Sequence, residues 1–187
     1  KGIELLDSFT IKVSSGENWH DFVEWTVKNK KYGLENLALI PGTVGAGPIQ
    51  NIGAYGSEIG AYIKEVTFYD FHKDTVGAFS QKDCNFSYRS SVFKEKPELF
   101  ILSVTFELNN EPKLNLSYDS LKEQISKDGL NEKNLTPIDI FNTVKKIRTR
   151  VLPNHLKQPN VGSFFKNVYL KKEELKKLKL PSDIQTF

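Results

Sequence analysis

The 187-residue sequence contains no methionine, a single cysteine and three histidines. Because translation begins at methionine, we expect Lys1 to lie within a longer protein and segments to be missing at the ends. The one thiol, Cys84, cannot form a disulfide within the chain, and three scattered histidines offer no zinc-binding spacing. These absences predict a reducing compartment, the cytoplasm, and no metal site.

Long apolar runs, internal repeats and low-complexity tracts are also missing. No apolar segment approaches the ~20 residues that cross a bilayer, and the first residues carry neither the charged nor the apolar region of a secretion signal. With 39% hydrophobic and 26% charged residues, the composition is that of a globular protein. We therefore expect a folded chain without membrane insertion, about the size of one domain with part of a second.

Charge is unevenly distributed along the chain. Residues 1–144 carry 15 basic and 20 acidic side chains, whereas residues 145–187 carry 11 basic and 3 acidic ones. A basic segment attracts nucleic acid, an acidic protein or a phosphorylated small molecule, and charge alone does not separate these partners. The alternative is a solvated, lysine-rich helix around residues 171–179.

Strand-like patterns occur in four segments, which are rich in β-branched and aromatic residues. They are residues 9–13, 62–71, 75–79 and 99–108. The second and third flank His72, Lys73 and Asp74 and therefore predict a hairpin.

Two segments have helical periodicity. The first follows polar residues 15–18 and the second begins at Thr136 and Pro137, which suit the first positions of a helix. Their expected buried faces are Trp19, Phe22, Val23 and Val27, and Ile140, Phe141, Val144, Ile147 and Val151. Pro153 ends the second helix, and the aperiodic residues 154–160 resemble a linker. We predict an α+β fold with a domain boundary there, giving residues 1–153 and 154–187.

Residues 40–56 form the most unusual segment, with five of the chain's 12 glycines among small residues and prolines. Glycine lets backbone amides turn outward, and successive amides can form a nest that binds phosphate. The segment lacks the Gly-Lys-Ser/Thr ending of a Walker loop and the strand-helix frame of a dinucleotide-binding Gly-x-Gly-x-x-Gly motif. It is either a different kind of ligand loop or an irregular structural loop.

The order of residues in this segment resembles a known family. Residues 33–37, 40–45 and 48–56 are similar to the flavin loop of UDP-N-acetylenolpyruvoylglucosamine reductases, which act in peptidoglycan precursor synthesis. Residues 86–93 resemble the arginine motif of that family, and residues 162–167 its serine motif, in the same order. Residues 115–118 with the helix expected after them resemble the longer, tyrosine-loop subtype.

This resemblance implies a partial chain: an FAD-binding domain of the vanillyl-alcohol-oxidase (PCMH) type, lacking its N-terminal part, and the start of a substrate-binding domain. In the family, NADPH reduces FAD, and the flavin then delivers hydride to the alkene of UDP-N-acetylglucosamine enolpyruvate. The implied product is UDP-N-acetylmuramate. The implied protein is a monomer that binds no nucleic acid.

The resemblance also assigns residues to roles. It implies two catalytic residues, Arg89, which stabilises the developing enolate, and Ser163, which protonates the inner carbon. Cofactor contacts are implied at Pro41, Gly42, Val44, Gly45, Ala46, Pro48, Gln50, Asn51, Ile52, Gly53 and Arg148. Substrate contacts are implied at Tyr55, Tyr88, Tyr118, Lys166 and Asn167.

The sequence departs from the family at Val151, where a lysine is common, and Arg150 is the neighbouring cation. Two other hypotheses stay open: a flavin oxidoreductase of the same superfamily with a different substrate, and a non-enzymatic binder of nucleic acid or an acidic protein through the basic segment. The second lacks an RNA-recognition motif and a helix-turn-helix.

Overall fold

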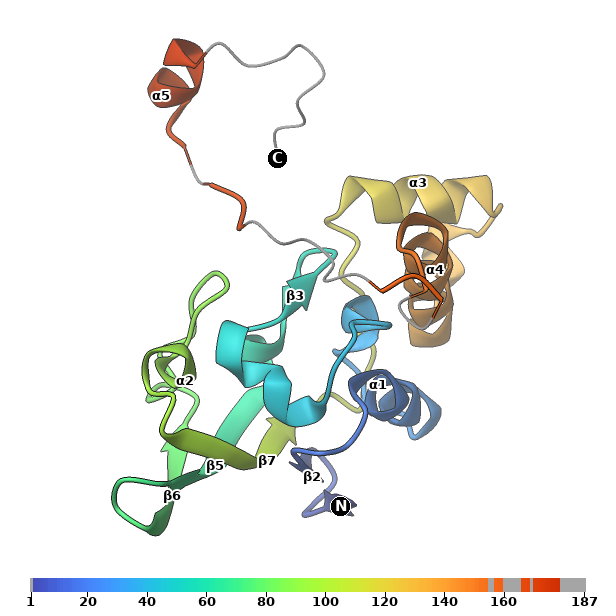
Figure 1. Ribbon diagram of the computed structural model, residues 1–187. Coiled ribbons are helices and arrows are strands. Elements are labelled where there is room, and N and C mark those ends of the chain that lie inside the picture. Colours follow the sequence, from blue (N-terminus) through green and yellow to red (C-terminus); the bar gives the residue numbers. More distant parts are fainter. Residues whose placement is uncertain (1, 155–156, 160–165, 169, 179–187) are drawn as a thin grey trace.

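The computed structural model describes residues 2–154, 157–159, 166–168 and 170–178. Its main feature is a five-stranded antiparallel sheet with the order β1-β2-β7-β5-β6 (Figure 1). The strands are β1 (Ile3–Leu5), β2 (Thr10–Ser14), β5 (Ile63–Asp70), β6 (Thr75–Ser80) and β7 (Leu99–Glu107). The four predicted strand segments are confirmed, and β1 is an addition.

The β5–β6 hairpin forms because its turn residues satisfy their own backbone. Asp70 accepts hydrogen bonds from the amides of His72 (2.9 Å) and Lys73 (3.1 Å). Asp74 adopts a φ of 53°, a left-handed conformation that aspartate tolerates. The predicted hairpin is confirmed.

Five α-helices are described: α1 (Trp19–Lys28), α2 (Val92–Glu95), α3 (Asp119–Lys127), α4 (Pro137–Val151) and α5 (Lys172–Lys177). Asn18 caps α1 by accepting from the Asp21 amide, and Thr136 and Asp139 form a capping box before α4. In Figure 1, α1, α3 and α4 lie together beside the sheet, and α4 packs against both other helices.

The core lies between the sheet and these helices. Trp19, Phe22 and Phe106 are nearly inaccessible and pack edge to face or tilted, with ring centroids 5.0–6.2 Å apart. The indole of Trp19 donates to the Leu37 carbonyl (2.8 Å), so its polar atom is satisfied. This bond also attaches residues 35–37 to the helix.

The structure contradicts one expectation about the helices and agrees with another. Val151 is 65% exposed at the last position of α4, so its predicted place on the buried face is wrong, because the core ends one turn earlier at Ile147. The lysine-rich helix expected near residue 171 is present as α5.

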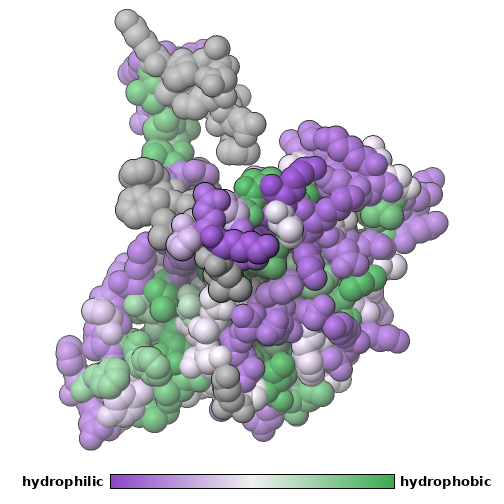
Figure 2. Space-filling model, turned by 45° about the vertical axis from the view of Figure 1, so that its right-hand side comes forward, coloured by the Kyte–Doolittle hydropathy of each residue, from purple (hydrophilic) through white to green (hydrophobic). Residues whose placement is uncertain are grey.

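No helix in the described part of the chain is long and apolar enough to span a membrane. Hydrophilic side chains dominate the right-hand side of the face in Figure 2.

Candidate functional site

The glycine-rich segment folds into tight turns followed by a small hairpin. The turns are the 3-10 helices η2 (Val44–Ala46) and η3 (Pro48–Gln50), and the hairpin pairs β3 (Gly53–Ala54) with β4 (Ser57–Glu58). Pro48 suits the first position of η3 because its missing amide needs no partner there. Figure 1 shows this segment between the sheet and the α1/α4 side of the molecule.

Many backbone amides of the segment are used inside the fold. The Val44 amide donates to the Glu17 carbonyl and the Gly45 amide to the Ser15 carbonyl, both at 2.9 Å. The amides of Ala46, Gly47, Asn51 and Ile52 also donate to carbonyls of the same segment. The expectation of outward-turned amides is therefore wrong at these six positions, because their hydrogen bonds hold the turns together.

Several glycines of the segment are required by close packing. A Cβ on Gly45 would lie 2.5 Å from Ser15 Cβ, and one on Gly47 would lie 2.7 Å from Ile59 Cδ1. On Gly53 it would lie 2.8 Å from Arg89 Nη1 and 2.9 Å from the Ser57 carbonyl oxygen. The structural-loop alternative thus accounts for part of the glycine pattern.

Part of the segment is exposed. Among the predicted cofactor contacts, Pro41, Gly42, Ala46 and Gln50 are exposed. Gly42 has a φ of 122°, and a Cβ there would meet only Ala46 Cβ, at 3.9 Å. The other predicted contacts of the segment lie inward: Val44, Gly45, Pro48, Asn51 and Ile52 are buried and Gly53 is half-buried. The small exposed residues Gly42 and Ala46 leave the backbone here open to close approach by a ligand such as a flavin dinucleotide.

Arg148 and His20 hold the chain that leads into the segment. Leu39 has a φ of 58°; its amide donates to His20 Nδ1 (3.0 Å), and its carbonyl accepts from Arg148 Nε (3.1 Å). The His20 ring stacks on Phe141 with centroids 5.4 Å apart. Burial, and then the charge of Lys145, lower the pKa of His20, which favours the neutral ring that accepts this bond.

The tip of the β3–β4 hairpin lies next to Arg148. Tyr55 and Gly56 both have positive φ (47° and 80°), as a two-residue turn of the I′ type requires. Burial raises the pKa of Tyr55, opposed by the neighbouring Arg148 guanidinium, and burial lowers the pKa of Arg148. Tyr118 packs edge to face on Tyr55, with centroids 5.4 Å apart. The structure thus joins two predicted substrate contacts to one predicted cofactor contact.

Two asparagines hold this hairpin in place. Asn36, which is 3% exposed, donates from its side chain to the carbonyls of Tyr55 (2.8 Å) and Asn115 (2.9 Å). Asn115 donates to the Gly56 carbonyl (2.9 Å). Sequence reasoning assigned neither residue a role, although both lie within the family-like stretches.

Arg89 sits on a second tight turn, between Ser87 and Ser90, which exchange backbone hydrogen bonds of 3.1 Å. Its own φ is 52°, and its guanidinium donates to the Gly53 carbonyl (2.7 Å) and lies 3.7 Å from the Glu58 carboxylate. The arginine motif and the glycine-rich segment, separated in sequence, therefore meet directly.

Tyr88 and Lys166 extend this contact. The guanidinium carbon of Arg89 lies 4.9 Å, and the ammonium of Lys166 5.3 Å, from the centre of the Tyr88 ring. Asn167 is exposed. Ser163 lies outside the described residues. Arg150 donates to the Gln124 side chain (3.0 Å), so it is engaged by α3, and the exposed Val151 offers no charge in its place.

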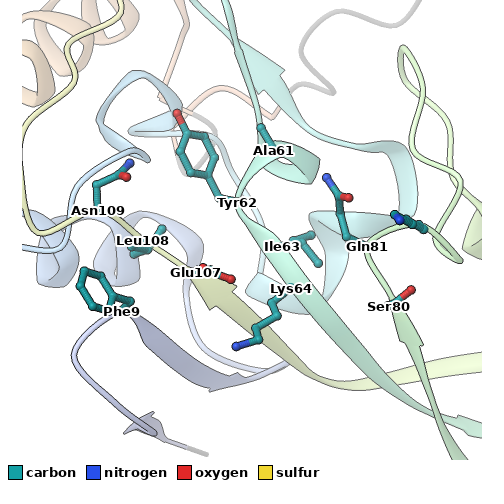
Figure 3. A pocket seen from close by; sticks show the side chains of 11 residues that line it. Phe9, Ala61, Tyr62, Ile63, Lys64, Ser80, Gln81, Glu107, Leu108 and Asn109 are labelled. Carbon is teal, nitrogen blue, oxygen red and sulfur yellow. The ribbon is translucent and has the colours of Figure 1, made fainter.

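A cavity of about 570 Å³ lies apart from these predicted site residues, near the start of β5 and the end of β7 (Figure 3). Phe9, Tyr62, Lys64 and Glu107 contribute to its lining, and no predicted site residue does.

Within the described part of the chain, no group of three histidine, cysteine, aspartate or glutamate residues could hold a metal ion. Cys84 is buried, and burial raises the pKa of its thiol to about 12, which makes it unreactive at neutral pH.

Comparison with known proteins gives consistent matches. The family described as "FAD binding domain" matches residues 1–75. The UDP-N-acetylenolpyruvoylglucosamine reductases of Polynucleobacter asymbioticus and Photobacterium profundum are each 44% identical to the chain, over 88% and 89% of its length. These matches cover 47% and 48% of the two relatives, so the chain spans about half the length of the curated relatives it matches.

A solved structure supports the same fold. The crystal structure of UDP-N-acetylenolpyruvylglucosamine reductase (MurB) from Thermus caldophilus aligns with a TM-score of 0.54 at 21% identity, covering 73% of this chain and 42% of that one. The α+β architecture predicted from the sequence is confirmed, and it is that of an FAD-binding domain. Over most of its length, the chain is similar to UDP-N-acetylenolpyruvoylglucosamine reductases.

Proposed function

We propose that the full-length protein carrying this chain reduces UDP-N-acetylglucosamine enolpyruvate to UDP-N-acetylmuramate in the cytoplasm, with NADPH as co-substrate and FAD as cofactor. The observation that carries the proposal is the contact of the Arg89 turn with the glycine-rich segment, since the guanidinium bonds the Gly53 carbonyl. A cation that suits the substrate and the glycine-rich segment that suits the flavin are thereby in direct contact. The sequence similarity to reductases of this name supports the same assignment.

Each group of residues has a task in this proposal. The exposed Gly42, Ala46 and Gln50 would contact FAD, and Arg148 would fix the loop that precedes them. When bound, FAD supplies transfer of hydride from NADPH to the substrate alkene. As negative charge develops on the substrate carboxylate side, the planar guanidinium of Arg89 stabilises it through paired hydrogen bonds.

The remaining predicted contacts surround Arg89 and the β3–β4 hairpin. Tyr88 lies beside Arg89 and is approached by Lys166, and Tyr55 lies beside Arg148 and packs on Tyr118. Hydroxyl and ammonium groups of this kind suit the diphosphate and sugar of a nucleotide sugar. We assign Ser163 the proton for the inner carbon, and Asn167 a substrate contact, from the serine motif. We also place a domain boundary near residue 153.

The test follows NADPH consumption by the purified full-length protein. The proposal expects a flavin spectrum and NADPH oxidation that depends on the enolpyruvyl nucleotide sugar, above slow reaction with oxygen. Bound flavin without substrate-dependent oxidation would favour a different flavin oxidoreductase. A colourless protein that is retained on RNA in a salt-dependent way would favour the nucleic-acid binder.

Ser163 gives a second test. In Ser163→Ala, reduction of the flavin by NADPH should persist, while reduction of the substrate falls by orders of magnitude, as expected for loss of an acid used in one step. Stopped-flow measurement of the two half-reactions separates them. Equal slowing of both would assign Ser163 a structural role.

A further inference from the structure

The contact between Arg89 and the glycine-rich segment is built by two side chains that the sequence did not assign to it. Glu58, on β4, has one carboxylate oxygen 3.7 Å from Arg89 Nη1, and its other oxygen accepts from Asn51 Nδ2 (2.9 Å). Asn51 Nδ2 also donates to the Ser87 carbonyl (3.0 Å), next to the Arg89 turn. A chain of polar contacts thus joins β4, the residue that follows η3, and the Arg89 turn.

Asn51 is fully committed to this network. It is 2% exposed, has a φ of 46°, and its Oδ1 accepts from the Gly60 amide (2.9 Å). Its side-chain donors and acceptor therefore serve protein groups. The resemblance implied a cofactor contact at Asn51, whereas the geometry gives its amide side chain a positioning task.

The contacts of Glu58 and Asn51 matter because Arg89 lies on a tight turn. A long arginine side chain on a two-residue turn loses rotamer freedom when it adopts one orientation. The Gly53 carbonyl holds Nη2 at 2.7 Å, and the carboxylate of Glu58 faces Nη1. Nη1 also donates to the Asn51 carbonyl (3.5 Å), and about 30% of the Arg89 side chain stays exposed, so the held side chain is still accessible to a ligand.

We propose that Glu58, itself fixed by Asn51, is a positioning residue that orients the Arg89 guanidinium toward the anionic end of the substrate. The inference rests on the proposed function and names a residue for the same site. Glu58 touches neither substrate nor cofactor in this proposal. Its removal should therefore affect the step in which Arg89 acts and leave reduction of the flavin unchanged.

The primary test compares Glu58→Gln, Glu58→Asp and the wild-type full-length protein. Glu58→Gln keeps an oxygen acceptor for Asn51 Nδ2 but removes the charge facing Arg89, whereas Glu58→Asp keeps the charge. We expect Glu58→Gln to slow the substrate half-reaction about tenfold, a typical cost of losing orientation at a reacting centre. Flavin reduction by NADPH should stay within about twofold, and Glu58→Asp should recover part of the loss.

A matched control is Glu65→Gln, which removes the same charge from an exposed position on β5 and should leave both half-reactions unchanged. Calorimetric binding of the enolpyruvyl nucleotide sugar to the oxidised protein adds a readout that does not depend on turnover. There, Glu58→Gln should weaken affinity severalfold, because the carboxylate of the substrate meets a less well oriented guanidinium.

A double-mutant cycle decides whether Glu58 acts through Arg89. In the Arg89→Lys background, Glu58→Gln should cause no further loss, since the oriented guanidinium is already absent. Additive losses, equal slowing of both half-reactions, or an unaffected substrate half-reaction in Glu58→Gln would each overturn the inference. Failure of the proposed function itself is distinguishable, because the wild-type protein would then show no substrate-dependent oxidation.

Discussion

At the residue scale, Gly45 illustrates how a glycine assigned to a ligand can be required by packing. In Gly45→Ala the new Cβ would lie 2.5 Å from Ser15 Cβ and 3.2 Å from the carbonyl that accepts the Gly45 amide. Relief requires separation of two backbone segments, which typically costs about 1–3 kcal/mol of unfolding free energy. Urea unfolding of the chain measures this loss.

Gly16→Ala is the matched control for that substitution. No heavy atom lies within 4 Å of the position its Cβ would take. We expect a change within about 0.5 kcal/mol. Equal destabilisation by both alanines would show that Gly45 is not closely packed.

His20 gives a prediction about pH. Its folded-state pKa lies below the usual 6.5, because burial and Lys145 disfavour the charged ring. The unfolded chain therefore binds more protons just below pH 6.5, so this contribution to stability is complete above 6.5 and is lost as the pH falls through the lowered pKa.

The measurement is the free energy of unfolding across this pH range. His20→Gln, which cannot titrate, should remove the His20 part of the slope, and the bond to the Leu39 amide that is lost on protonation is worth about 1 kcal/mol. A slope unchanged in His20→Gln would contradict the role of the ring.

At the element scale, the β3–β4 hairpin depends on side chains from outside it. Its two strands have two residues each, too few to be stable alone. Asn36 supplies hydrogen bonds to two backbone carbonyls from a buried position. Asn36→Ala leaves both carbonyls unsatisfied, which we expect to cost about 1–3 kcal/mol of unfolding free energy.

Thermal unfolding of Asn36→Ala and Asn142→Ala tests this hairpin argument. Asn142 is exposed within α4, where alanine has the higher helix propensity, so its replacement should be neutral or slightly stabilising. A similarly small effect of Asn36→Ala would mean that the hairpin holds its position without these bonds.

The same contrast explains which elements the sequence could predict. β5, β7, α1 and α4 are long enough for their apolar period to be recognised, and each buries one face in the core. The β3–β4 hairpin has no such period, and its turn carries Tyr55 where asparagine or aspartate is the usual signal. It is specified by contacts with distant residues, which local patterns do not encode.

The candidate site divides in a similar way. The family-like motifs identified Arg89 and the glycine-rich segment, and the structure brings these together. They did not reveal that Asn51 faces inward or that Glu58 lies beside Arg89. A motif records which residue types recur in order, whereas the direction of each side chain is set by the three-dimensional packing around it.

At the scale of the whole molecule, the hydrophobic core ends before the predicted domain boundary. The buried apolar side chains of the described residues all fall between Ile11 and Ile147. Described side chains after residue 165 are exposed, except for the half-buried Leu175. The basic side chains of this last part therefore lie on the surface. Removal of the segment after residue 153 should change the stability of the core little.

A chain that ends at Pro153 tests this division. Because it keeps the whole described core, we expect cooperative unfolding with a midpoint within about 4 °C of that of the 187-residue chain, equivalent to about 1 kcal/mol. Calorimetry at matched protein concentration measures the midpoint. A second truncation after Leu135, which removes α4, is the contrast and should abolish cooperative unfolding, since Ile140, Phe141 and Val144 are fully buried. Loss of cooperative folding in the Pro153 chain would place the boundary later in the sequence.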